Sequence, residues 1–236
     1  MNNSNKGEFY FGITDTQIYI CFFEEGKNEF EQTLDFEIPD NLSNKLNFKI
    51  VQNLLKENIR KLEKDLGFFL NSGNISIKSK SYQSITFSIK NIFDENKLNE
   101  KIIINLIQGA IQQFYKIEKN LYIAHILINK YIIDEKVYDF FPKNIDFKKI
   151  ILEIEFICLD NNLINKVKSL FQECKIDVKN IISFDYAKKF LNQDKDYTLC
   201  VSAKKILNGA NQSEIYFMDI SSKKPSLFHK IFNFFD

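Results

Sequence analysis

Residues 150–182 read IILEIEFICLDNNLINKVKSLFQECKIDVKNII. Apolar and other side chains alternate from Ile150 to Cys158, which is the period of a β-strand with one buried face. Apolar residues then recur at helical spacing over Leu163–Cys174, and Ile176–Ile182 has strand character again. A strand, a helix and a strand in succession predict a mixed α/β fold.

The chain upstream and downstream of this segment has the same mixed character. Helical periodicity predicts helices over Phe48–Leu66 and Leu98–Tyr115, and Gly67 is suited to end the first of them. Shorter helices are expected over Ala187–Leu191 and Thr198–Leu207. Strands are expected at Phe9–Phe23 (two, around a turn at 14–16), Phe30–Ile38, Ile75–Ile77, Ile85–Ile89, Leu121–Ile133 and Ile215–Ile220, and a turn region at 139–144.

Composition excludes several classes of protein. The 236 residues carry a net charge of +1 and are 44% hydrophobic, so a sizeable core is expected without a general attraction to nucleic acid. Arg60 is the only arginine, whereas base and phosphate recognition relies on that side chain, so no nucleic-acid partner is expected. The four cysteines form no CxxC pair and the chain has two histidines, so no metal site is expected.

The sequence also predicts a reduced cytoplasmic protein. Cys21 and Cys158 lie in apolar runs, which suits buried free thiols. The first residues, 1–6, are polar and unlike a signal peptide, and no apolar run reaches about 18 residues.

The last twelve residues, Pro225–Asp236, form an amphipathic pattern. Wound as a helix, they place a wide aromatic face opposite His229, Lys230, Asn233 and Asp236. Such a helix is expected to lie in a membrane interface, and the alternative is that it docks on the protein's own core. The residues expected to bind membrane are Lys223, Lys224, Leu227, Phe228, Lys230, Ile231, Phe232, Phe234 and Phe235.

No catalytic constellation is present in the sequence. It contains no Ser-His-Asp set, nucleophile elbow, P-loop or GxGxxG, and no two carboxylates stand out for acid–base work. His125 lies within an apolar strand, where a satisfied structural role is expected. We therefore expect a protein that is not an enzyme and has no cofactor.

Several segments, taken in order, carry a resemblance to a family. His125, Tyr131 and Asp134 have the spacing of His-x-x-Pro-x-x-Tyr-x-x-Asp, with Ile128 in place of the proline. Residues 174–182, Cys-Lys-Ile-Asp-Val-Lys-Asn-Ile-Ile, resemble a Cys-Gly-Leu-x-Val-x-x-Ile-x segment. These patterns resemble the bacterial cell-division protein FtsA, as do the two early helices and the amphipathic tail. The resemblance covers about 9–190 and the tail.

The resemblance implies an actin-like organisation. Residues 8–82 and 161–208 would form a partial, ribonuclease H-like subdomain 1A, and 83–160 an inserted subdomain 1C, of the SHS2 type. Residues 209–224 would be a linker and 225–236 the membrane-targeting helix. The family's second lobe is expected to be missing, because Asp194–Asn208 resembles the late helix that returns to 1A.

The family's first phosphate turn, Asp-x-Gly-Thr, is degenerate here. Without gaps it falls on Gly12, Ile13, Thr14 and Asp15, and sliding the register to Asp15 and Thr16 leaves no glycine after them. Backbone amides need that glycine to approach a phosphate closely. We therefore expect no nucleotide hydrolysis and no bound cofactor.

The resemblance implies a non-catalytic division adaptor held on the inner face of the cytoplasmic membrane at the septum. Its partners would be divisome proteins (FtsZ or late division proteins), the anionic membrane surface and, as an open question, other copies of itself. The alternatives are a PilM-like actin-fold partner of a pilus or secretion apparatus, a divergent ATPase, and an α/β interaction protein with a core-docked tail.

Overall fold

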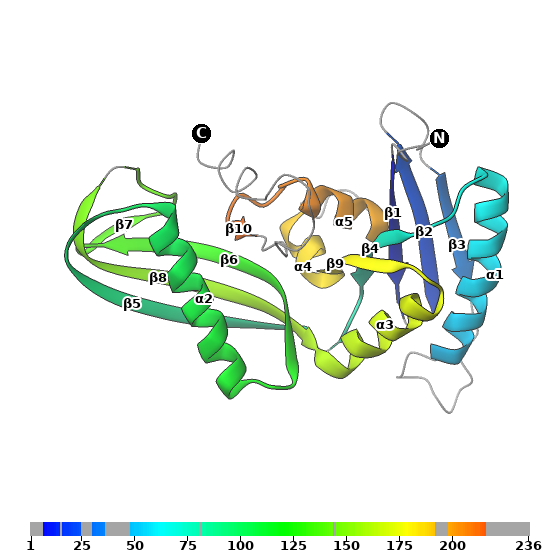
Figure 1. Cartoon of the computed structure of the whole chain (residues 1–236), viewed down its shortest axis with the longest axis horizontal. Coiled ribbons are helices and arrows are strands. Elements are labelled where there is room, and N and C mark those ends of the chain that lie inside the picture. Colours follow the sequence, from blue (N-terminus) through cyan, green and yellow to red (C-terminus); the bar gives the residue numbers. More distant parts are fainter. Residues whose placement is uncertain are drawn as a thin grey trace. The chain divides into compact units, whose positions relative to one another are not determined.

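A computed structural model describes residues 7–14, 16–24, 30–35, 48–80, 82–143, 145–191 and 198–215 (Figure 1). The chain divides into two compact units. Unit 1 comprises the described residues of Met1–Tyr82 and Leu159–Ala210, and unit 2 those of Gln83–Cys158 and Asn211–Asp236. Residues 83–158 of unit 2 are therefore inserted into the sequence of unit 1, and its described residues 211–215 follow unit 1.

Unit 1 contains a sheet of five strands in the order β3-β2-β1-β4-β9. Consecutive strands β1, β2 and β3 pair antiparallel, whereas β1 with β4 and β4 with β9 pair parallel. A parallel pair needs a long crossover, which helix α1 provides between β3 and β4. The bounds are β1 Gly7–Ile13, β2 Gln17–Glu24, β3 Phe30–Asp35, α1 Phe48–Leu66, β4 Ser72–Ile77 and β9 Asp177–Ser183.

Helices cover both faces of this sheet. The ring of Phe171 in α3 (Asn161–Glu173) lies 4.8 Å from that of Phe11, and α5 (Leu199–Leu207) contacts β1, β2 and β4. Gly12 faces Leu199 of α5. Neighbouring residues of a strand point to opposite faces, so α3 and α5 lie on opposite sides of the sheet. The short helix α4 (Phe184–Phe190) follows β9 directly.

Unit 2 consists of one helix and a second sheet. The sheet order is β10-β6-β8-β5, and β7 pairs with β6. Helix α2 buries Ile103, Leu106, Ile107, Ala110 and Phe114. Burial of each of the larger side chains in this set stabilises the fold by about 1.5–3 kcal/mol. Phe114 meets Phe87 of β5 and Phe156 of β8 edge-on. The bounds are β5 Gln83–Lys97, α2 Glu100–Ile117, β6 Leu121–Ile133, β7 Lys136–Tyr138, β8 Asp146–Asp160 and β10 Glu214–Ile215.

The mixed α/β class is confirmed, and the predicted bounds of α1 and β6 are those found. β5 is much longer than the expected strand at Ile85–Ile89, and β7 was not expected. A linker was expected over 209–224 and a last strand at Ile215–Ile220; the structure pairs Glu214 and Ile215 with β6. Residues 216–224 and the tail 225–236 lie outside the described residues.

Helix α3 ends in a Schellman motif with an unusual residue. The N–H of Ile176 donates to the carbonyl of Phe171, and the N–H of Lys175 to that of Gln172. Lys175 occupies the left-handed position, with φ of 61°. Glycine is the preferred residue there because it has no Cβ.

Lys175→Gly is expected to raise the free energy of unfolding by about 1 kcal/mol, because it removes the left-handed strain. The matched control is Gly209→Ala at the same position after α5, where φ is 81° and a Cβ would meet nothing within 4 Å. The free energy of unfolding of Gly209→Ala is expected to fall by about the same amount. Urea unfolding followed by circular dichroism measures both, and a destabilised Lys175→Gly would contradict the argument.

Candidate functional site

The turn between β1 and β2 is closed on itself. The Thr14 hydroxyl accepts hydrogen bonds from the N–H groups of Thr16 at 3.2 Å and Gln17 at 2.9 Å. The N–H of Thr14 donates to the carbonyl of Gln17 at 3.0 Å. A phosphate-binding turn directs such N–H groups toward the ligand. Here these three donors bond within the turn, and Asp15, expected in the degenerate loop, lies outside the described residues.

Gly12 is required for packing. It pairs with Tyr19 across the hairpin, and a Cβ at this position would lie 2.6 Å from Cβ of Leu199. Ordinary Cβ contacts are longer than about 3.4 Å because two carbons in contact are 3.5–4.0 Å apart. The glycine therefore lets α5 approach β1, a reason that sequence reasoning could not find because Leu199 is remote in the chain.

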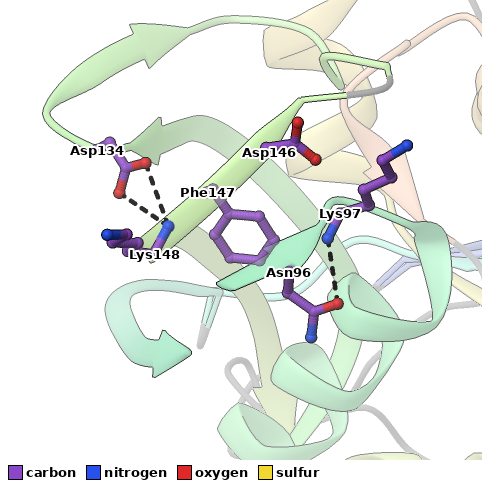
Figure 2. Close-up of a pocket in the computed structure, with 6 residues that line it drawn as sticks. All are labelled: Asn96, Lys97, Asp134, Asp146, Phe147 and Lys148. Carbon is purple, nitrogen blue, oxygen red and sulfur yellow. Dashed lines mark hydrogen bonds between the residues drawn. The ribbon is translucent and has the colours of Figure 1, made fainter. Parts of the chain in front are cut away.

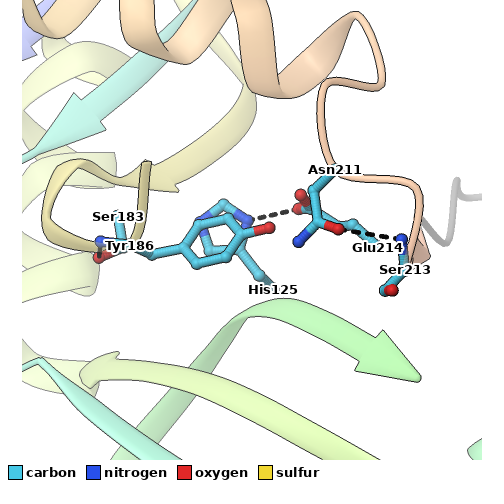
Figure 3. Close-up of polar contacts among 6 residues, drawn as sticks. All are labelled: His125, Ser183, Tyr186, Asn211, Ser213 and Glu214. Carbon is cyan, nitrogen blue, oxygen red and sulfur yellow. Dashed lines mark hydrogen bonds and ion pairs between the residues drawn. The ribbon is translucent and has the colours of Figure 1, made fainter. Parts of the chain in front are cut away.

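A buried polar pair lies on the edge of the unit 2 sheet (Figure 3). His125 Nδ1 is 2.6 Å from Oε1 of Glu214, and both side chains are 1% exposed. A carboxylate can only accept, so Nδ1 carries the proton of this bond. The pair satisfies two polar groups that would be costly to bury alone.

Backbone and side-chain bonds hold Glu214 in this place. β10 pairs Glu214 with Leu127 of β6, and the carbonyl of Ser213 accepts from the N–H of Ile128 at 2.9 Å. The side chain of Asn211 accepts from the N–H of Ser213 (Figure 3). The structural role expected for His125 thus has a partner that the sequence did not reveal, because Glu214 fell within the expected linker.

A hollow of about 660 Å³ in unit 2 is lined by Asn96, Lys97, Asp134, Asp146, Phe147 and Lys148 (Figure 2). The Asp134 carboxylate accepts from the N–H groups of Lys148 and Lys149. The Asn96 side chain accepts from the N–H of Lys97. Both side chains thus support backbone, and no predicted site residue lies in this hollow.

The cysteines do not have the surroundings of reactive thiols. Cys21, Cys158 and Cys200 are buried, and all four cysteines are free. Burial, with a smaller contribution from Glu118, raises the pKa of the Cys158 thiol to about 12. Burial also raises the pKa of Cys174, which is partly exposed. Within the described ranges, no three His, Cys, Asp or Glu side chains gather closely enough to hold a metal ion.

The expected membrane-binding residues, from Lys223 to Phe235, lie outside the described residues. In the part of the chain that is described, no helix is both long enough and apolar enough to cross a membrane.

Comparison with known proteins gives structural neighbours only. No protein-family model and no curated protein matches the sequence. The chain is similar to a chain of a PilM-PilN type IV pilus biogenesis complex, with a TM-score of 0.43 and 7% identity over 76% of this chain. It is also similar to a protein of unknown function with an actin-like ATPase fold from Bacteroides thetaiotaomicron, with a TM-score of 0.28 and 13% identity over 79% of this chain.

The present chain spans about half the length of these two neighbours, since it covers 48% and 58% of them. Because both TM-scores are below 0.5, we draw no conclusion about family or activity from either likeness.

Proposed function

We propose that this protein is a non-catalytic, actin-like adaptor that binds protein partners and is held peripherally on a membrane by its C-terminal residues. The observation that carries the proposal is the insertion of residues 83–158, the main part of unit 2, between β4 and α3 of unit 1. The FtsA resemblance places subdomain 1C at that point of 1A. The strand order of unit 1, with an antiparallel half and a parallel half, suits a ribonuclease H-like 1A.

The β1–β2 turn supports a role without nucleotide chemistry. Its described N–H donors bond to Thr14 and Gln17, and Gly12 serves the packing of α5. The alternative of a divergent ATPase is tested by calorimetry of the full chain with Mg-ATP. We expect no binding in the micromolar range, and binding at that level would favour the ATPase.

The partner class follows from the resemblance. A division adaptor would meet FtsZ or late division proteins on the inner face of the cytoplasmic membrane, at the septum. A PilM-like adaptor of a pilus or secretion apparatus would share the inserted unit but would not need the aromatic tail. A fluorescent fusion that gathers at the pilus machinery and avoids division sites would favour this alternative.

The tail is expected to bind membrane weakly and reversibly. Half-burial of Phe228, Ile231, Phe232 and Phe235 contributes on the order of 4 kcal/mol. Lys223, Lys224 and Lys230 add up to about 1 kcal/mol each near an anionic leaflet. High salt should remove the lysine contribution and leave the apolar one. Co-sedimentation with anionic vesicles should therefore retain the full chain and release a chain ending at Ser222.

A matched pair of variants separates insertion from charge. Phe232→Asp places a negative charge on the apolar face and should abolish the binding that survives high salt. Asn233→Asp adds the same charge on the polar face and should weaken binding only at low salt. Equal partitioning of the full and shortened chains would instead show that the tail docks on the protein itself.

A further inference from the structure

Strand β5 is an open edge of the unit 2 sheet. Among the described residues, its one strand neighbour is β8, to which Gln83–Ile92 pair without interruption. In an antiparallel pair, every second residue of an edge strand directs its N–H and C=O away from the neighbour. About five such residues therefore offer backbone groups for a further strand.

The edge lacks most of the features that block further pairing. Residues 83–93 contain one charged residue, Lys90, and no proline or glycine. Exposed edges usually carry several charges, a proline or an early bulge. Here the irregularity in pairing comes only after Ile92.

The two faces of β5 differ in character. Ile85, Phe87 and Ile89 are half-buried and pack on the hydrophobic core beneath α2. Ser84, Thr86, Ser88 and Lys90 form an exposed row on the other face. On that second face, Glu155 of β8 lies opposite Thr86 and accepts hydrogen bonds from Ser84 and Asn129.

We propose that β5 pairs antiparallel with β5 of a second copy of this chain, about a two-fold axis near Phe87 or Ser88. The two-fold operation keeps each row on its face, so the half-buried apolar row of one copy continues that of the other. It also places Lys90 opposite Ser84 or Thr86 of the second copy, on the same face as Glu155 of that copy, which is one strand further into its sheet. The edge is thus complementary to itself in both apolar pattern and charge, independently of the proposed membrane role.

A charge exchange tests the pairing in the full chain. Sedimentation velocity should show a monomer–dimer equilibrium, and Lys90→Glu or Glu155→Lys should each weaken dimerisation by about tenfold. The double variant Lys90→Glu/Glu155→Lys should restore most of the loss. Lys188→Glu on α4 of unit 1 makes the same charge change and should have no effect. A monomer at about 100 μM, or no rescue by the double variant, would overturn the proposal.

Cysteine scanning along the exposed row tests the geometry. We expect Thr86→Cys or Ser88→Cys to form a disulfide-linked dimer most readily, with Ser84→Cys and Lys90→Cys less efficient, because distances grow away from the axis. Ser169→Cys on α3 is the control and should not cross-link. Equal cross-linking at all four positions would indicate a parallel arrangement, and cross-linking at none would indicate another interface or a different partner for β5. Each of these results would contradict the two-fold pairing.

Discussion

Glu214→Ala is expected to lower the free energy of unfolding by about 1–3 kcal/mol, which is the usual cost of leaving a buried polar group without its hydrogen-bond partner. The bond between His125 and Glu214 is 2.6 Å long, with both side chains 1% exposed. Without the carboxylate, the imidazole Nδ1–H loses this acceptor in a buried place. Urea unfolding measures the loss, and hydrogen exchange at Ile128, whose N–H donates to the carbonyl of Ser213, should report the release of β10.

Two further variants separate the bond from the volume of the side chain. Glu214→Gln keeps a carbonyl oxygen in place of the carboxylate and should cost less than half as much as Glu214→Ala. The double variant His125→Ala/Glu214→Ala should cost clearly less than the sum of the single variants, since the two residues are in contact. Additive losses would mean that the bond contributes nothing and that only packing is lost.

Gly12→Ala should destabilise unit 1 by about 1–3 kcal/mol, the range for overpacking a tight interior. The added Cβ would lie 2.6 Å from Cβ of Leu199 and 3.2 Å from Cβ of Tyr19. A Cβ atom is fixed by the backbone, so the overlap is relieved only if α5 moves. Thermal unfolding of the full chain measures the effect.

Gly109→Ala in helix α2 is the control. Its new Cβ would have one neighbour, Ile89, at 3.4 Å, and alanine favours a helix interior by up to about 1 kcal/mol over glycine. This variant should be neutral or stabilising. Removing the obstacle with Leu199→Gly should make Gly12→Ala less costly, and a loss that is unchanged in that background would place its cause elsewhere.

Long elements with strong periodicity could be predicted from the sequence. The bounds of α1 and β6 were predicted correctly because the apolar residues of each element keep a regular period over its whole length. The full length of β5 was missed because its second half, beyond Ile89, has asparagine and charged residues that read as a loop. β10 is only two residues long, and it is defined by its pairing with β6, a contact between distant parts of the sequence.

The roles of individual residues were harder to predict than the elements. In the sequence, Gly12 stood where a phosphate turn would have aspartate. The structure explains the glycine by the close approach of helix α5, which lies far along the chain. His125 needs Glu214, which local pattern could not connect to it. Lys175 sits in a conformation that its side chain does not favour, and no periodicity indicates this. These contacts link distant parts of the sequence, which local propensity does not encode.

The inserted position of unit 2 also sets an order of events during synthesis. A ribosome completes residues 83–158 before it has made β9 or α5 of unit 1. The helix α2 and the strands β5, β6 and β8 can therefore associate early, through contacts that are close in sequence. The hairpin of β1 and β2 emerges before unit 2, yet Gly12 lacks its contact with Leu199 until that residue leaves the ribosomal exit tunnel. During synthesis, unit 2 is therefore nearly complete while the two parts of unit 1 that flank it in the sequence have not yet packed together.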